Sequence, residues 1–121
     1  MAKNILIADD EPDMADFLKT ALEAEGYTVD SAGSADQIAA KLKTFAAELI
    51  LLDMGMPGLD PVTPAQDIRN KTKTKAKIII MTGRDIAKEQ KEGHLRGSDG
   101  ALQKGSGMDV IVKKVREVAP K

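Results

Sequence analysis

The residues that could carry out chemistry stand at the ends of short apolar runs of this chain. Asp9 and Asp10 follow "NILIA", Asp53 closes "LILLD", Thr82 closes "KIIIMT" and Lys104 closes "ALQK". Carboxylates that gather at one place repel each other, so one or more shifts toward its protonated form unless a cation neutralises the charge. Mg²⁺ is a hard ion that prefers carboxylates, water and phosphate as ligands, and it fits such a set of acids. A hydroxyl group and an ammonium group beside the ion would then contact an oxyanion.

The stretch "ELILLDMGMPGLD", residues 48–60, shows where one of these acids stands. Its four consecutive apolar residues, 49–52, predict a strand that is buried on both faces, because a strand with one wet face would alternate apolar and polar side chains. Gly55 and Pro57 follow Asp53 closely, and neither residue type lets a central strand continue. Asp53 is therefore expected where the strand leaves the sheet.

Short apolar runs of this kind alternate with segments whose apolar residues recur at helical spacing. The alternation predicts an α/β fold, a doubly wound five-stranded parallel sheet with five helices over its two faces. Sites in such sheets gather at the carboxyl ends of the strands, where the five residues named above stand. The expected strands are 4–8, 27–32, 48–53, 76–82 and 101–104, and the expected helices are 11–26, 34–45, 63–70, 85–96 and 107–118.

Capping patterns and helical spacing add detail to the expected helices. Gly26 is expected to end the first helix in a left-handed conformation. Ser34 and Gln37 match the capping-box pattern at the start of the second helix. The spacing of apolar residues places Phe17 on the buried side of the first helix and Val62 on the buried side of the third.

Length and composition are typical of one domain, expected to span 1–121. The 121 residues are 42% hydrophobic, which is enough for one core. The chain has no cysteine, and no stretch approaches the roughly 18 apolar residues of a spanning helix. We therefore expect a soluble, cytoplasmic protein without membrane insertion. The basic segment "RNKTKTKAK", residues 69–77, lacks interleaved aromatic residues and favours a solvated surface over a nucleic-acid site.

Four short motifs resemble those of a known protein family. They are "DDE" at 9–11, "DMGMP" at 53–57, "MTG" at 81–83 and the lysine of "GALQKG", Lys104. Their order and approximate separations resemble the receiver domain of bacterial two-component response regulators, of the single-receiver type found in chemotaxis. The resemblance covers essentially the whole chain and implies a flavodoxin-like, three-layer sandwich.

The resemblance implies that Asp53 accepts a phosphoryl group in Mg²⁺-dependent phosphorelay signalling. Asp10 and Asp53 would bind Mg²⁺ directly, together with the backbone carbonyl of Gly55. Asp9 would act on the ion mainly through water. The protein would contribute position and charge neutralisation to the transfer, beyond the nucleophilic carboxylate itself.

The resemblance also implies roles for two further residues and a set of partners. Thr82 would hydrogen-bond the phosphoryl group, and Lys104 would pair with its charge. The phosphodonor would be a histidine kinase, a phosphotransfer protein or a small molecule. The signal would pass to a downstream output protein or to a domain missing from this chain, with no direct nucleic-acid binding. The chain would not be an enzyme in the ordinary sense, because it would catalyse at most its own phosphorylation and dephosphorylation.

Three positions depart from the family pattern. Pro61 stands where a glycine is usual, Ala101 where an aromatic residue is usual, and Gly105 in place of the proline that usually follows the lysine. A trans peptide bond is expected before Gly105, because a cis bond before a residue other than proline costs roughly 3 kcal/mol. These departures leave the phosphorylation residues in place. They concern how the protein passes its signal to an output protein or domain.

Two other functions stay open at this point. A degenerate receiver would bind partners without phosphate, and the absence of a ring at Ala101 favours it. A Mg²⁺-dependent phosphatase resembling the haloacid dehalogenases would need a D-x-D pattern after the first strand, which Asp9-Asp10-Glu11 lacks. The single histidine, His94, is interpreted as exposed or as interacting with a helix C-terminal dipole, and not as a phosphate relay.

Overall fold

The computed structural model describes residues 3–120 and shows a five-stranded sheet in which every strand is parallel to its neighbours. The strand order across the sheet is β2-β1-β3-β4-β5. This is the doubly wound arrangement that the alternation in the sequence predicted. The strands are β1 (Asn4–Ala8), β2 (Thr28–Ala32), β3 (Leu49–Asp53), β4 (Lys77–Thr82) and β5 (Gly100–Gln103).

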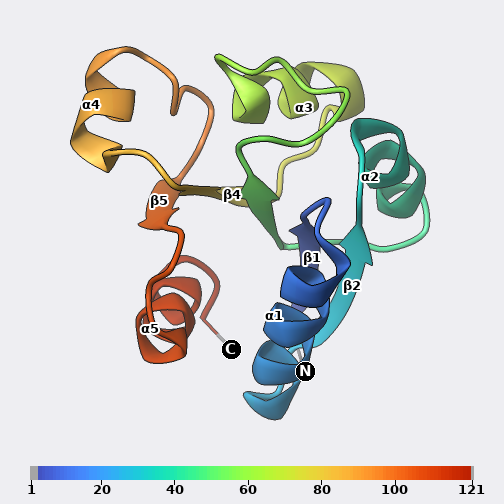
Figure 1. The fold of residues 1–121 in the computed structure, drawn as a ribbon. Helices are drawn as coiled ribbons and strands as arrows, with labels where there is room; N and C mark the ends of the chain where they lie inside the picture. The colour runs from blue at the N-terminus through green and yellow to red at the C-terminus, as the bar shows by residue number, and fades with distance from the viewer. Residues whose placement is uncertain (1–2, 121) are drawn as a thin grey trace.

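Within the described residues, five helices cover the two faces of the sheet and complete a three-layer sandwich (Figure 1). One face carries α1 and α5, and the other carries α2, α3 and α4. None of the helices between residues 3 and 120 is both long and apolar enough to span a membrane. The helices are α1 (Pro12–Ala24), α2 (Ala35–Leu42), α3 (Pro64–Thr72), α4 (Ile86–Lys91) and α5 (Met108–Val118).

β3 lies at the centre of the sheet, and all of its residues are buried. Its side chains alternate between the two layers of helices. Leu49 and Leu51 belong to the hydrophobic cluster shared with α1 and α5, whereas Ile50 and Leu52 belong to the cluster shared with α2 and α3. A strand that is covered on both faces has no wet side, which explains its unbroken apolar run.

The carboxyl ends of four adjacent strands carry the residues singled out in the sequence. Asp9 follows β1, Asp53 ends β3, Thr82 ends β4 and Lys104 follows β5. β2 lies outside this set, at the edge of the sheet beyond β1. Because the strands are parallel, these four ends meet along a single edge of the sheet. The strand order therefore places every candidate residue next to another.

The capping predictions are confirmed in part. Gly26 has a φ of 98°, so α1 ends in the left-handed turn that was expected. The Ser34 side chain accepts a hydrogen bond from the Gln37 backbone nitrogen at 3.2 Å, as an N-cap should. The Gln37 side chain accepts from the Gly33 backbone nitrogen at 2.6 Å instead of closing on Ser34. Only one half of the capping box is thus formed.

Two apolar side chains that were expected in the core are exposed, and that expectation was wrong. Phe17 is 58% exposed and Val62 is 50% exposed. α1 packs on the sheet through Ala15, Leu18 and Leu22. Phe17 precedes Leu18 by one residue, or about 100° around the helix, which turns its ring away from the sheet. Val62 lies before the first turn of α3, where no helix face constrains it.

α4 is half as long as the helix that was expected over 85–96. It ends at Lys91, and Gly93 follows with a φ of 82°. The Gly93 backbone nitrogen donates to the Gln90 carbonyl at 3.1 Å, which closes the helix with a turn. A glycine in the left-handed conformation ends a helix in this way because it has no Cβ to clash with its own backbone.

Candidate functional site

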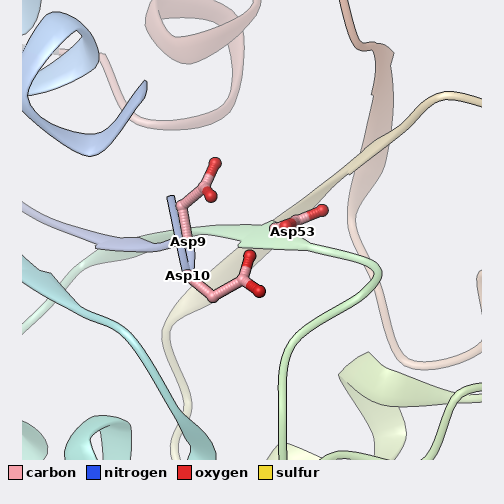
Figure 2. Close-up of side chains that lie close together, drawn as sticks. All are labelled: Asp9, Asp10 and Asp53. Carbon is pink, nitrogen blue, oxygen red and sulfur yellow. The ribbon is translucent and has the colours of Figure 1, made fainter. Parts of the chain in front are cut away.

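Three carboxylates gather at the carboxyl edge of the sheet. One oxygen from each of Asp9, Asp10 and Asp53 lies within 4.8 Å of the others. Figure 2 shows Asp9 and Asp10 leaving the end of β1 beside Asp53 at the end of β3. Asp9 and Asp53 are buried, whereas Asp10 is exposed. The expectation that folding brings these acids together is confirmed.

Asp9 has an environment that disfavours its negative charge. Burial raises the pKa of the Asp9 carboxyl above its usual range, and the neighbouring charge of Asp53 raises it further. The backbone nitrogen of Glu11 donates to Asp9 Oδ1 at 2.9 Å and opposes this effect. The net effect is a raised pKa, so a further positive charge nearby would stabilise the Asp9 carboxylate.

Lys104 supplies one such positive charge. Its Nζ lies 2.8 Å from Oδ1 of Asp53, and its side chain is 30% exposed. Burial alone would lower the pKa of Lys104, but the hydrogen bond to Asp53 and the charges of Asp53 and Asp9 outweigh it and raise the pKa. Lys104 is therefore held as an ammonium ion against the buried carboxylate of Asp53.

Thr82 is buried at the end of β4, between the ends of β3 and β5. Its Oγ1 accepts a hydrogen bond from the Arg84 backbone nitrogen at 3.0 Å. Its carbonyl oxygen accepts from the Lys104 backbone nitrogen at 2.7 Å. The second bond joins the ends of β4 and β5 and so positions Lys104. The first leaves the Thr82 hydroxyl hydrogen available for another acceptor.

The loop after β3 completes the site. The Gly55 backbone nitrogen lies 3.4 Å from Asp53 Oδ1, and the Pro57 carbonyl accepts from the Ala35 backbone nitrogen at 3.0 Å. The second contact fastens the loop to the start of α2. An open cleft lies between this loop and the ends of the strands. It is lined by Asp10, Asp53, Met54, Gly55, Pro61, Thr82, Gly83, Arg84 and Lys104.

The donor atoms of this site suit a hard divalent cation. The acidic cluster offers carboxylate oxygens alone, which are the ligands that Mg²⁺ prefers. The exposed carboxylate of Asp10 gives an ion access from the cleft. A cation here would offset both the burial of Asp9 and the repulsion between Asp9 and Asp53. The residues therefore fit the ion that the sequence predicted.

Arg84 and Glu89 were missed in the sequence, and the expectation that His94 is exposed was wrong, because its side chain is only 17% exposed. Arg84 lines the cleft, two residues after Thr82. Glu89 is 3% exposed within α4, and its carboxylate contacts Nδ1 of His94. His94 is thus a partly buried partner of an acid. The position of Arg84 two residues after Thr82 was the only signal in the sequence for these three residues. The burial of Glu89 gave no such signal, because it depends on how α4 packs.

An α/β protein with these groups at the carboxyl edge of its sheet has the fold and the site of a receiver domain. The chain belongs to the response regulator receiver domain family, whose family model matches residues 5–116. The transcriptional regulatory protein ResD of Bacillus subtilis (strain 168) is 33% identical over 112 residues, 93% of this chain and 46% of that protein. AruR of Pseudomonas aeruginosa is 31% identical and covers 98% of this chain and 50% of its own length. The chain spans about half the length of the curated relatives it matches.

Solved structures agree with this family membership. The response regulator protein TrrA of Thermotoga maritima, in complex with Mg²⁺ and BeF, is 32% identical with a TM-score of 0.80, over 96% of this chain and 98% of that one. A two-component response regulator from Clostridium difficile is 27% identical with a TM-score of 0.83, over 96% and 94% of the two chains. The Vibrio cholerae chemotaxis protein CheY4 has the same fold, with a TM-score of 0.83 at 21% identity over 98% and 99%.

Proposed function

We propose that this chain is a phosphoacceptor, in which Asp53 takes a phosphoryl group from a histidine kinase or a phosphotransfer protein. The observation that carries the proposal is the convergence of Asp9, Asp10, Thr82 and Lys104 on the Asp53 carboxylate. Two more acids beside an ordinary ion pair would only weaken it, because like charges repel. The same groups suit a carboxylate that binds a cation and carries a phosphoryl group.

In the transfer, an Asp53 carboxylate oxygen forms a bond to phosphorus while the bond between phosphorus and the donor breaks. The electron pair of the broken bond leaves with the donor, and Asp53 keeps the phosphoryl group as an acyl phosphate. Lys104, which now pairs with Asp53, would pair with a phosphoryl oxygen. The Thr82 hydroxyl would donate its free hydrogen to another, since its Oγ1 already accepts from the Arg84 nitrogen.

Mg²⁺ is the proposed cofactor. Asp10, Asp53 and the Gly55 carbonyl would hold the ion, and Asp9 would act mainly through water. The ion would neutralise negative charge between the acids and the phosphoryl oxygens. The oxygen donors of the cleft and the unfavourable charge at Asp9 support this assignment.

The proposed unit of function is a receiver domain over residues 1–121 that acts in the cytoplasm. Its partners would be the phosphodonor and either a downstream output protein or an output domain joined to the receiver. The chain spans about half the length of its curated relatives, two of which are transcriptional regulatory proteins by name, and this supports the second arrangement. The receiver itself would catalyse only its own phosphorylation and dephosphorylation.

A degenerate receiver that binds partners without phosphate is the second candidate. The observation that favours it is Ala101 in β5, where the resemblance implies an aromatic residue. The two candidates differ in whether Asp53 ever carries a phosphoryl group. They are therefore separated by a chemical measurement at Asp53.

The test is the intact mass of the chain after incubation with acetyl phosphate and Mg²⁺. We expect the added mass of one phosphoryl group in the wild type, none in Asp53→Asn, and loss of the group in mild base or hydroxylamine. Asp16→Asn changes an exposed acid on α1 in the same way and should be modified like the wild type. An unmodified wild type would favour the degenerate receiver, and modification of Asp53→Asn would move the acceptor to another residue.

A further inference from the structure

A buried carboxylate in α4 is held by two cationic or proton-donating side chains. Glu89 is 3% exposed, and its two oxygens face different partners. Oε1 lies 3.5 Å from an Arg84 guanidinium nitrogen, and Oε2 contacts Nδ1 of His94. The other ring nitrogen of His94 lies 3.6 Å from the carboxylate of Glu92. A buried acid needs such partners, because an unpaired charge is costly to remove from water.

Arg84 belongs to the cleft as much as to this cluster. It lines the cleft together with Asp53 and Lys104, and its backbone nitrogen is bonded to Thr82 Oγ1. Its side chain is 73% exposed, whereas that of Glu89 is 4% exposed. The backbone of Arg84 is thus fixed beside the proposed phosphoryl-binding hydroxyl, while the guanidinium is held to Glu89 by a single long ion pair. A guanidinium in this position has a second acceptor as soon as an anion enters the cleft.

We propose that Arg84 exchanges between Glu89 and the phosphoryl group on Asp53, and so transmits occupancy of the site to α4 and His94. The inference rests on the proposed phosphorylation of Asp53. It adds Arg84 as a residue that binds the phosphoryl group, and Glu89 and His94 as the residues through which α4 responds. With Arg84 on the anion, Glu89 keeps His94 as its partner, and the ring must adjust to the change in its acceptor. The beginning of α4 and the segment 92–96 then respond without any movement of an aromatic residue in β5.

The physical basis of the exchange is competition for one cation. A phosphoryl group on Asp53 carries more negative charge than a carboxylate and offers several oxygens, so it attracts the guanidinium more strongly than Glu89 does. Removing Glu89 as a competitor must strengthen anion binding, since the coupling between two sites acts equally in both directions. The same reasoning predicts that loss of Arg84 weakens anion binding and disconnects His94 from it.

The experiment uses the whole chain with Mg²⁺ and beryllofluoride, a mimic of the phosphoryl group. Two quantities are measured by NMR: the apparent Kd for beryllofluoride, from the Gly83 amide, and the ring nitrogen shifts of His94 at saturation. In the wild type we expect binding to change the His94 shifts. In Arg84→Gln we expect about fivefold weaker binding and no change at His94 on saturation. Arg84→Lys should restore part of the affinity, and Glu89→Gln should bind more tightly than the wild type.

Lys91→Gln is the matched control, because it removes an exposed cation from the same helix without touching the cleft. It should behave like the wild type in both measurements. Should Glu89→Gln fail to fold, the two variants of the exposed Arg84 still test whether Arg84 binds the anion and couples it to His94. Wild-type affinity in Arg84→Gln, or a His94 response that persists in it, overturns the inference, as does a wild type that binds beryllofluoride without any response at His94. A wild type that does not bind beryllofluoride at all overturns the proposed function as well.

Discussion

Nζ of Lys104 lies 2.8 Å from Oδ1 of Asp53, and this pair spans the sheet from the end of β5 to the end of β3, across β4. The contact compensates the charge of the buried Asp53 carboxylate in the absence of a phosphoryl group. It also keeps an ammonium group at the point where a phosphoryl group on Asp53 would develop charge. A side chain that pairs with Asp53 in the resting site is thereby placed to stabilise the product of the proposed phosphoryl transfer.

Lys104→Met is expected to slow the uptake of a phosphoryl group from acetyl phosphate by about a hundredfold, because a fixed positive charge no longer faces the transferred group. The measurement is the initial rate of mass gain in saturating Mg²⁺. Lys113→Met replaces an exposed lysine of α5 and should react at the wild-type rate. Equal rates in Lys104→Met and the wild type would remove Lys104 from the mechanism.

Mg²⁺ is expected to raise the free energy of unfolding of the wild type, by about 2.7 kcal/mol at a hundred times its Kd.

Asp9→Asn should raise the melting temperature of the metal-free protein, since the amide carries no charge to bury and its oxygen can still accept from the Glu11 nitrogen. The same variant should gain less from Mg²⁺. Thermal melts with and without Mg²⁺ measure both effects, and a wild-type melting temperature that does not change in saturating Mg²⁺ argues against the metal site.

Asp30 is expected to make a pH-dependent contribution to stability far from the cleft. Burial alone would raise its pKa, but hydrogen bonds from the Lys41 ammonium at 3.0 Å and the Ser31 backbone nitrogen outweigh it and hold the pKa below its usual range. A carboxyl whose pKa is lower in the folded state stabilises the fold above its unfolded pKa of about 3.9. That contribution disappears as the pH falls through the folded pKa.

The measurement for Asp30 is urea unfolding of the wild type and Asp30→Asn at several pH values. At pH 7 the variant should lose no more than about 1 kcal/mol, because both side chains are partly solvated. The two proteins should become equal in stability at acid pH, below the folded pKa of Asp30. Asp16→Asn, which changes an exposed acid of α1 beyond the first turn of that helix, should match the wild type throughout. A difference that stayed constant with pH would point to packing and not to charge.

Ala101 is expected to restrict how far phosphorylation rearranges the face of α4, β5 and α5. It lines a hollow with Ile86, Leu95 and Lys114, and it offers no ring that could move in response to a phosphoryl group beside Thr82. Backbone amide shifts should change on beryllofluoride binding at 53–60 and 82–96, and little at 98–118. Ala101→Tyr should extend the changes into 98–118, because a ring there has two positions to occupy. Large changes over 98–118 in the wild type would contradict this prediction.

The sequence by itself determined the strands, the fold class and the position of the acids. β1, β3 and β4 each contain a continuous apolar run. Such a run is the pattern expected of a strand that is covered by helices on both faces. An acid followed by glycine and proline can only leave such a strand, so Asp53 had to stand at its carboxyl end. These conclusions depend on residues close together in the chain, which is why local patterns were sufficient. The peptide before Gly105 is also trans, as the cost of a cis bond predicted.

The tertiary structure alone decided which of these groups are neighbours. The order β2-β1-β3-β4-β5 is the result of how the helices pack on the two faces, and it places Lys104 against Asp53 although 50 residues lie between them in the chain. The same packing exposes Phe17 and buries Glu89, in each case against what the residue type favours. Burial and pairing depend on the summed contacts of distant segments, so no local pattern contains them.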